Sequence, residues 1–271
     1  MKNKKYSKFD PLILFAKLMS KVTEFTSTIF YTFYDGVIPP LLGIDRLQEL
    51  AVSDYDCSSM YMGQEHNTSG LYLWEKEGIG EYLSAGKSFL VLAAGGGREA
   101  ISLLRKGVKV DAYECNTDLR TAGNRLLKNE KLNCSIQPME FSKFPNVPTE
   151  SLYDFCIVGW SAYSHILIRQ DRIELLKGIK KTVKGPVLIS FIGKARVQKI
   201  KKILRDLLSF LPGRANIISY DLVAKPGVVS VGFNENNIRE EAAEAGYIVA
   251  KYKNHRPEYP YAVLIPDLAK E

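Results

Sequence analysis

Hydrophobic positions divide the chain into two parts with different periodicities. From residue 9 to residue 33, apolar side chains recur every three or four positions, as on one face of an amphipathic helix. After residue 86, short apolar runs alternate with helical patterns, which is typical of a parallel sheet covered by helices. We therefore expect a mostly helical cap over residues 1–85 and an α/β domain over residues 86–271.

The second part reads as an ordered series of strands and helices. The expected strands and helices before residue 212 are strands 88–94, 108–113, 134–137, 153–159 and 186–192 and helices 99–106, 118–130, 171–183 and 194–211. Extended segments at 215–223 and 228–232, a helix at 236–245 and a strand pair at 247–253 and 261–265 follow. This order predicts an α/β fold with a mostly parallel sheet, helices on both of its faces and a closing strand pair.

The N-terminal helix should end near residue 35, because Asp35-Gly36 and Pro39-Pro40 are helix-interrupting pairs. Its apolar face must be buried somewhere, and we expect that face to pack on the α/β domain. Docking on a membrane surface is the alternative, since four lysines precede the helix, namely Lys2, Lys4, Lys5 and Lys8.

Composition and charge exclude several classes of protein. With 271 residues and 46% hydrophobic content, the chain can form a large core. The net charge of +7 is spread along the chain, and no nucleic-acid-binding module is recognisable. The four cysteines form no Cys-x-x-Cys pair, so neither a disulfide framework nor a metal site is indicated. Charged residues cut short the one leader-like apolar run, and no membrane-spanning stretch follows, so a cytoplasmic protein is expected.

A glycine loop separates the first expected strand from the first expected helix. Gly95, Gly96 and Gly97 lack side chains there, so the backbone can approach a ligand closely. Glu114 ends the second expected strand, where a carboxylate can accept hydrogen bonds from both hydroxyls of a ribose. Together, the loop and the carboxylate indicate a cofactor that contains a nucleoside.

The loop resembles the first motif of the class I S-adenosylmethionine (SAM)-dependent methyltransferases of the small-molecule type, a strand ending in acid-x-Gly-x-Gly-x-Gly. Residues 91–99 match it, with two departures. Ala93 stands where the family usually has an acid, and Glu99 stands where it often has the third glycine. We hypothesise that Glu99 takes over the contact with the cofactor's ammonium group. The alternative is that Glu99 only favours the positive end of the helix dipole.

The resemblance extends over about residues 86–266 and implies SAM as the cofactor. It also implies a Rossmann-like, doubly wound, mostly parallel seven-stranded sheet with a closing antiparallel strand. An acid and an apolar residue after the third strand match the family's adenine contacts, and the end of the fourth strand matches its fourth motif. The implied cofactor-binding residues are Ala93, Gly95, Gly96, Gly97, Glu99, Glu114, Cys115, Glu140, Phe141, Gly159 and Trp160.

Methyl transfer from a sulfonium is an in-line displacement, so positioning supplies much of the rate and few catalytic residues are needed. A general base helps where the acceptor must lose a proton, and the candidates are His165, His66 and Tyr163. The substrate candidates are Tyr61, Trp74 and again Tyr163, whose rings would suit a cationic acceptor. The alternative for these histidines and aromatic residues is a structural role in the loop or the core.

Several functions are compatible with these motifs. The leading one is SAM-dependent methylation of a nitrogen or oxygen of a small-molecule metabolite. Transfer of the aminocarboxypropyl arm of SAM would use the same binding motifs. An NAD-dependent dehydrogenase is a third candidate, because residues 95–100 also satisfy the G-x-G-x-x-G/A pattern. A non-catalytic membrane-surface adaptor is the fourth. The expected partner of the enzyme is a small-molecule acceptor, with no nucleic acid involved.

Overall fold

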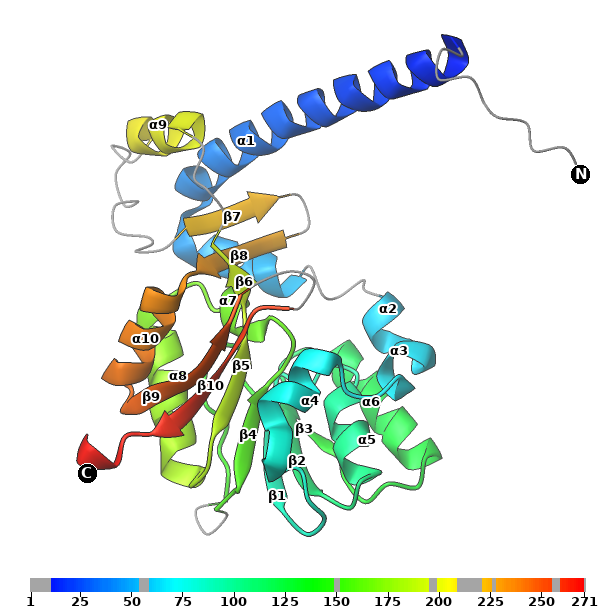
Figure 1. Cartoon of the computed structure of the whole chain (residues 1–271), viewed down its shortest axis with the longest axis vertical. Coiled ribbons are helices and arrows are strands. Elements are labelled where there is room, and N and C mark those ends of the chain that lie inside the picture. Colours follow the sequence, from blue (N-terminus) through cyan, green and yellow to red (C-terminus); the bar gives the residue numbers. More distant parts are fainter. Residues whose placement is uncertain are drawn as a thin grey trace, which may run out of the picture.

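The computed structural model describes residues 11–53, 59–148, 152–194, 199–208, 221–225, 228–254 and 259–270. A seven-stranded sheet forms its centre, in the order β3-β2-β1-β4-β5-β10-β9 (Figure 1). The strands are β1 (Ser88–Leu92), β2 (Lys109–Glu114), β3 (Ile136–Pro138), β4 (Phe155–Val158), β5 (Val187–Ser190), β9 (Tyr247–Lys253) and β10 (Tyr261–Pro266). β1 to β5 pair in parallel, and β10 is antiparallel to both of its neighbours. The predicted fold class is thus confirmed.

Helices cover both faces of this sheet. α4 (Leu73–Ile79), α5 (Arg98–Leu104) and α6 (Thr117–Asn129) contribute to one apolar cluster, and α8 (Arg169–Thr182) and α10 (Glu235–Glu244) contribute to the other. Successive side chains of a strand point to opposite faces. Phe89 and Val91 accordingly belong to the first cluster, and Leu90 and Leu92 belong to the second. Because both faces are covered, β1 is a continuous apolar run rather than an alternating one.

The first helix is longer than the sequence predicted. α1 spans Pro11–Ser53, continues through Pro39 and Pro40, and leaves helical geometry only at Gly43, where φ is 74° and ψ is 170°. The expectation that this helix ends near residue 35 was therefore wrong. A proline removes one N–H donor and crowds the preceding turn. Packing of the second half of α1 on β7, β8 and α9 offsets that cost.

A small second sheet lies beside α1. It has the order β6-β8-β7, from β6 (Ile192–Gly193), β8 (Val228–Phe233) and β7 (Asp221–Lys225). α9 (Lys199–Leu208) and these strands pack on α1, and the side chain of Asp35 accepts a hydrogen bond from the backbone N–H of Ala224 at 2.9 Å. The extended segment expected at 215–223 lies largely outside the described residues. The layer above the large sheet is therefore built from α1 and from elements between residues 192 and 233.

The N-terminal half of α1 projects away from the rest of the molecule (Figure 1). Its apolar face is exposed, with Leu12 at 78% and Phe25 at 67% of full exposure. The expectation that this face packs on the α/β domain was wrong, because burial begins only where α1 meets β7 and α9. No helix within the described ranges combines the length and hydrophobicity needed to cross a membrane.

Short helices connect α1 to the sheet and lie over one end of it. α2 (Ser59–Met62) packs on α6, and α3 (Gln64–Thr68) packs on α5. η1 (Gly80–Tyr82) leads into β1, α7 (Ala162–His165) follows β4, and η2 (Leu268–Lys270) follows β10. Tyr61 of α2 and Asn67 of α3 pack against Gly96 in the loop after β1, so both helices lie near the carboxyl end of that strand.

Candidate functional site

A cavity of about 340 Å³ lies at the carboxyl ends of β1, β2 and β4. Open α/β sheets place their ligands at this edge. The loops after these strands form one part of the lining, and α2 and α3 supply another part through Tyr61, His66 and Asn67. Sequence-predicted site residues at the cavity are Tyr61, His66, Ala93, Gly95, Gly96, Glu99, Glu114, Cys115, Phe141, Trp160 and His165.

Each glycine of the loop after β1 stands at its position for a different physical reason. Gly95 has φ at 54°, and a Cβ atom added to it would meet nothing within 4 Å, so open space adjoins its backbone. Gly96 packs beneath α2, because an added Cβ would lie 2.3 Å from the carbonyl oxygen of Tyr61. Gly97, with φ at 93°, is the N-cap of α5. Gly95 thus presents backbone to the cavity, while its neighbours shape the loop.

Glu114 joins this loop to the end of β2. Its buried carboxylate accepts hydrogen bonds from the backbone N–H of Gly95 at 2.7 Å and of Asn116 at 2.8 Å. The Cys115 thiol also donates to it, and burial together with the charge of Glu114 raises the pKa of that thiol to about 12. A carboxylate offers about four lone-pair sites. Glu114 therefore retains capacity for a further donor from the cavity.

Strained backbone gathers around the cavity. Ala93, Ser142 and Ser161 have φ values of 53°, 62° and 61°, and all three line the cavity. Among the described non-glycine residues, Lys131 is the remaining one with positive φ. Such conformations cost on the order of 1–3 kcal/mol and cluster at functional sites. The strain is an observation separate from the lining residues that supports this cavity as the candidate site.

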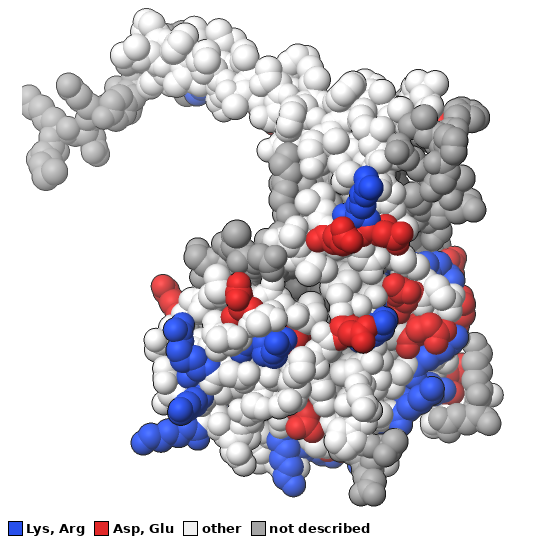
Figure 2. Space-filling view, turned by 180° about the vertical axis from the view of Figure 1, so that it is seen from behind, with Lys and Arg blue, Asp and Glu red and all other residues white. Residues whose placement is uncertain are grey.

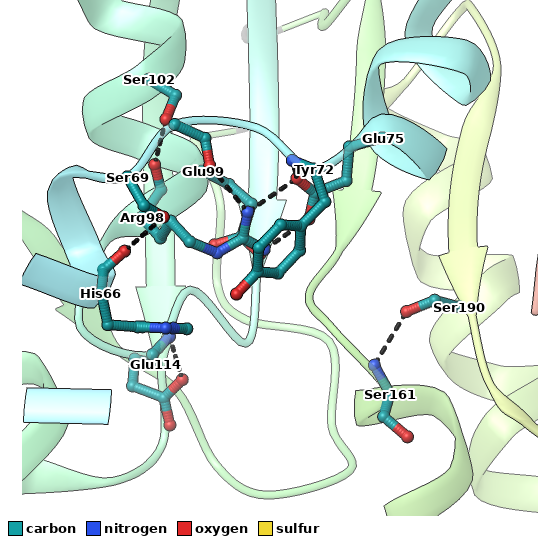
Figure 3. Close-up of polar contacts among 12 residues, drawn as sticks. His66, Ser69, Tyr72, Glu75, Arg98, Glu99, Ser102, Glu114, Ser161 and Ser190 are labelled. Carbon is teal, nitrogen blue, oxygen red and sulfur yellow. Dashed lines mark hydrogen bonds and ion pairs between the residues drawn. The ribbon is translucent and has the colours of Figure 1, made fainter. Parts of the chain in front are cut away.

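A buried ion cluster forms the cavity wall beside α5. Arg98 donates to both carboxylate oxygens of Glu75 and, at 2.6 Å, to Glu99 (Figure 3). Its guanidinium carbon lies 3.8 Å from the ring centroid of Tyr72. These contacts tie residues 70–75 to the start of α5. They also place one arginine against two carboxylates, which leaves surplus negative charge where Arg98 and Glu99 reach the cavity.

Burial and the neighbouring charges shift the pKa values of Glu99 and His66 at this wall. Burial raises the pKa of Glu99 to about 7, and Glu75 adds to the rise while Arg98 opposes it. Burial and the charge of Arg98 lower the pKa of His66. Glu99 is therefore a carboxylate that changes charge near neutral pH at the edge of the cavity.

Two histidines line the cavity from different elements. The Nδ1 atom of His165 lies 3.1 Å from the carbonyl oxygen of Val229. In the neutral ring this contact makes Nδ1 the donor and Nε2 the basic nitrogen. Burial lowers the pKa of His165, which keeps that ring neutral at pH 7. His66 lies on α3 and stacks on Trp160 with ring centroids 6.5 Å apart.

Some predicted site residues do not reach the cavity. Tyr163 is fully buried, and its hydroxyl donates to Glu241 at 2.5 Å, so its side chain supports the core. Trp74 packs on Tyr261, with ring centroids 6.0 Å apart. The Glu140 side chain is 73% exposed and pairs with Lys143. Gly97 and Gly159 shape the loops behind the lining, since a Cβ atom at Gly159 would lie 2.1 Å from the carbonyl oxygen of Ala93.

The structure also adds residues that sequence reasoning missed. Tyr72 and Tyr259 each lie with ring centroids 5.4 Å from that of Trp160, and Tyr259 lines the cavity. Asn67 is buried and donates to the carbonyl oxygens of residues 61 and 63. The aromatic richness of residues 61–74 was a signal for Tyr72. Nothing local marked Tyr259, which comes from the far end of the chain.

Comparisons with known proteins find structural likeness alone. No protein-family model matches the chain, and no curated protein matches its sequence. The CcbJ methyltransferase from Streptomyces caelestis is similar in structure, with a TM-score of 0.57, 11% identity and coverage of 80% of this chain and 98% of that one. A SAM-dependent methyltransferase from Methanosarcina mazei has a TM-score of 0.53 at 14% identity, covering 72% and 96% of the two chains.

A third similar structure contains the cofactor. Magnesium protoporphyrin IX methyltransferase from Synechocystis with bound SAM has a TM-score of 0.51 and 9% identity, covering 81% of this chain and 97% of that one. At such identities the likeness establishes the fold. The chain therefore has the Rossmann-like fold found in SAM-dependent methyltransferases.

Proposed function

We propose that this protein transfers the methyl group of SAM to a nitrogen or oxygen of a small molecule. One observation carries the proposal: the Gly95 backbone and the Glu114 carboxylate are bonded to each other at the edge of one cavity, with open space beside Gly95. Backbone without a side chain next to a carboxylate suits a ligand that contains a ribose. The fold shared with SAM-dependent methyltransferases supports SAM as that ligand.

The cavity lining fits SAM in its parts. Glu114 would accept a bond from a ribose hydroxyl, and the apolar Met139 and Phe141 would contact the adenine. The loop from Ala93 to Gly96 would lie against the methionine part, near Glu99. When bound, SAM supplies a methyl group on a positively charged sulfur. The surplus negative charge of the ion cluster favours a cation on this side of the cavity.

The histidines can serve the acceptor. Nε2 of a neutral His165 can take a proton from an N–H or O–H group, and such general-base help is worth about 10² to 10⁴ in rate. His66 is the second candidate base. Tyr61, Trp160 and Tyr259 form an aromatic wall that excludes water and offers ring faces to an apolar or cationic acceptor.

Calorimetric titration tests the cofactor site. SAM is expected to bind the wild type, and Glu114→Ala is expected to weaken it by about 1.5 to 3 kcal/mol, the scale of hydrogen bonds to a charged group. Asp118→Ala is the matched control, since Asp118 is exposed on the neighbouring helix α6 and is expected to leave affinity unchanged. Wild-type affinity in a folded Glu114→Ala protein would remove Glu114 from the site.

Product analysis separates the candidate reactions. When the protein is incubated with a mixture of metabolites, label on the methyl group of SAM is expected to appear in a product. Label on the aminocarboxypropyl carbons of SAM is not expected to appear there. The opposite distribution indicates aminocarboxypropyl transfer. Binding of NAD with no binding of SAM indicates a dehydrogenase.

His165→Gln is expected to lower kcat by about 10² to 10⁴ with SAM affinity unchanged. This result distinguishes a general base from a residue that contacts the cofactor.

A further inference from the structure

The projecting half of α1 carries a continuous apolar face. Leu18, Val22, Phe25, Ile29 and Phe33 follow one another at spacings of three or four, and each is between 46% and 67% exposed. Residues at these spacings lie on one side of a helix. A long row of large apolar side chains in contact with water is unusual for a single soluble chain and indicates an interaction surface.

α9 lies on the same side of α1. Gly36 continues the spacing from Phe33, and a Cβ atom added there would lie 2.8 Å from Leu204 Cδ1. α9 exposes apolar side chains of its own, with Ile200 at 65% and Leu207 at 65%. Figure 1 shows α9 beside α1 near the base of the projecting segment. We call the apolar face of residues 12–33 together with α9 the α1–α9 surface.

Basic residues accompany this surface. Between residues 11 and 34, Lys17 and Lys21 outnumber the single acidic residue, Glu24. The sequence of α9 holds four basic residues against one acidic residue, and the chain ahead of α1 adds four lysines. Figure 2 shows the projecting segment as almost entirely uncharged over the face in view. Apolar side chains flanked by lysines are typical of helices that lie in the surface of an anionic membrane.

We propose that the α1–α9 surface docks on an anionic lipid bilayer, with α1 lying in the plane of the membrane surface. Charge complementarity selects this occupant. Two copies packed through the same face would leave the net positive charge of this segment without a counter-charge, whereas anionic headgroups neutralise it. The polar side of α1, with Ser20 and Lys17, then faces water and headgroups while Phe25 and its neighbours enter the acyl boundary. This docking is independent of the chemistry in the cavity.

Vesicle sedimentation with the full chain tests the proposal. Wild type is expected to bind phosphatidylcholine vesicles that contain phosphatidylserine, to bind pure phosphatidylcholine less, and to lose binding as salt rises. Phe25→Asp is expected to reduce the bound fraction at least about tenfold, because it places a charge on the apolar face. Ser20→Asp adds the same charge to the opposite, exposed side, and its binding is expected to stay within about twofold of wild type.

Circular dichroism and urea unfolding show whether both variants fold, so a loss in Phe25→Asp is read on a folded protein. Equal losses in the two variants, or absence of wild-type binding to anionic vesicles, would overturn the proposal. Sedimentation velocity without vesicles tests whether a second copy of the chain covers the α1–α9 surface. A dimer that Phe25→Asp dissociates and Ser20→Asp leaves intact would identify a second copy as the occupant, and that result also overturns lipid docking.

Discussion

Two buried arginines bind carboxylates in this protein, and they differ in how the charge is balanced. Arg172 bonds Glu241 through Nε and Nη2, and its Nη1 donates to the carbonyl oxygens of residues 166 and 167. The hydroxyl of Tyr163 completes the set by donating to Glu241. One cation meets one anion, and neither Arg172 nor Glu241 lines the cavity. This cluster is neutral, and it joins α8 to α10.

In the second cluster the carboxylates outnumber the cation. Arg98 faces Glu75 and Glu99, and it lies at the cavity wall. A buried surplus charge costs free energy unless something compensates it. Protonation of Glu99 is one compensation, which its raised pKa reflects. A cationic ligand in the cavity is another. The balanced pair joins two helices of the core, whereas the unbalanced cluster beside the cavity offers negative charge to a cationic ligand.

The largest effect is expected in the neutral cluster. Arg172→Met leaves Glu241 buried with no cation, so the free energy of unfolding should fall by about 3 to 5 kcal/mol, as measured by urea unfolding. The affinity of the folded protein for SAM should not change, because this cluster does not line the cavity. Adding Glu241→Met should recover most of the stability. A loss below about 1 kcal/mol in the single variant would mean that water reaches the pair.

A smaller loss of stability is expected at Glu75. In Glu75→Gln the cation keeps Glu99 as a partner, so unfolding free energy should fall by about 1.5 to 3 kcal/mol, the scale of hydrogen bonds to a charged group. Glu77→Gln is the matched control on the same helix. Its ion pair with Lys253 is partly exposed, so Glu77→Gln should lower the unfolding free energy much less than Glu75→Gln. If Glu75→Gln lowers the unfolding free energy as much as Arg172→Met does, Glu99 alone does not compensate the charge of Arg98.

The smallest effect is expected in the pH dependence of SAM affinity. A cation binds better beside ionised Glu99, whose pKa is raised to about 7, so affinity should rise as Glu99 loses its proton. Calorimetry should show an increase of roughly tenfold between about pH 6 and pH 8, following the change in ionised fraction. Glu99→Gln should abolish that increase.

An analogue that lacks the amino group provides the control for this last prediction. It should show little pH dependence with either protein, because it carries no ammonium to meet Glu99. Identical pH profiles for SAM and the analogue would assign Glu99 to the helix terminus instead. That outcome would also leave the surplus charge of the second cluster without a ligand.

Local periodicity was a good guide to the elements of the large sheet. The predicted strand 108–113 is β2 (Lys109–Glu114), and the predicted helix 236–245 is α10 (Glu235–Glu244). These elements follow from patterns within ten or so residues. The same reasoning failed at Pro39 and Pro40, where packing against β7, β8 and α9 holds a helix that local propensity opposes. Propensity is a weak term once an element gains tertiary partners.

In the candidate site too, some residues could be predicted from the local pattern and others are brought in only by tertiary contacts. Parallel pairing of β1 with β2 brings Gly95 and Glu114 together, and both were predicted from their places at strand ends. The bond of Arg98 to Glu75 spans two elements, and Tyr259 arrives from beyond β9. Tyr163 sits in the predicted segment, yet its side chain turns into the core.

The sequence by itself determined the order of strands and helices, the glycine loop and the carboxylate that follows it. Those features depend on side-chain period and backbone freedom, which neighbouring residues set. Tertiary structure alone decided which carboxylates surround Arg98, which aromatic rings line the cavity, and that the apolar face of α1 faces water. Each of these depends on which distant surfaces meet, and the contact between two surfaces is not encoded in the local pattern of either one.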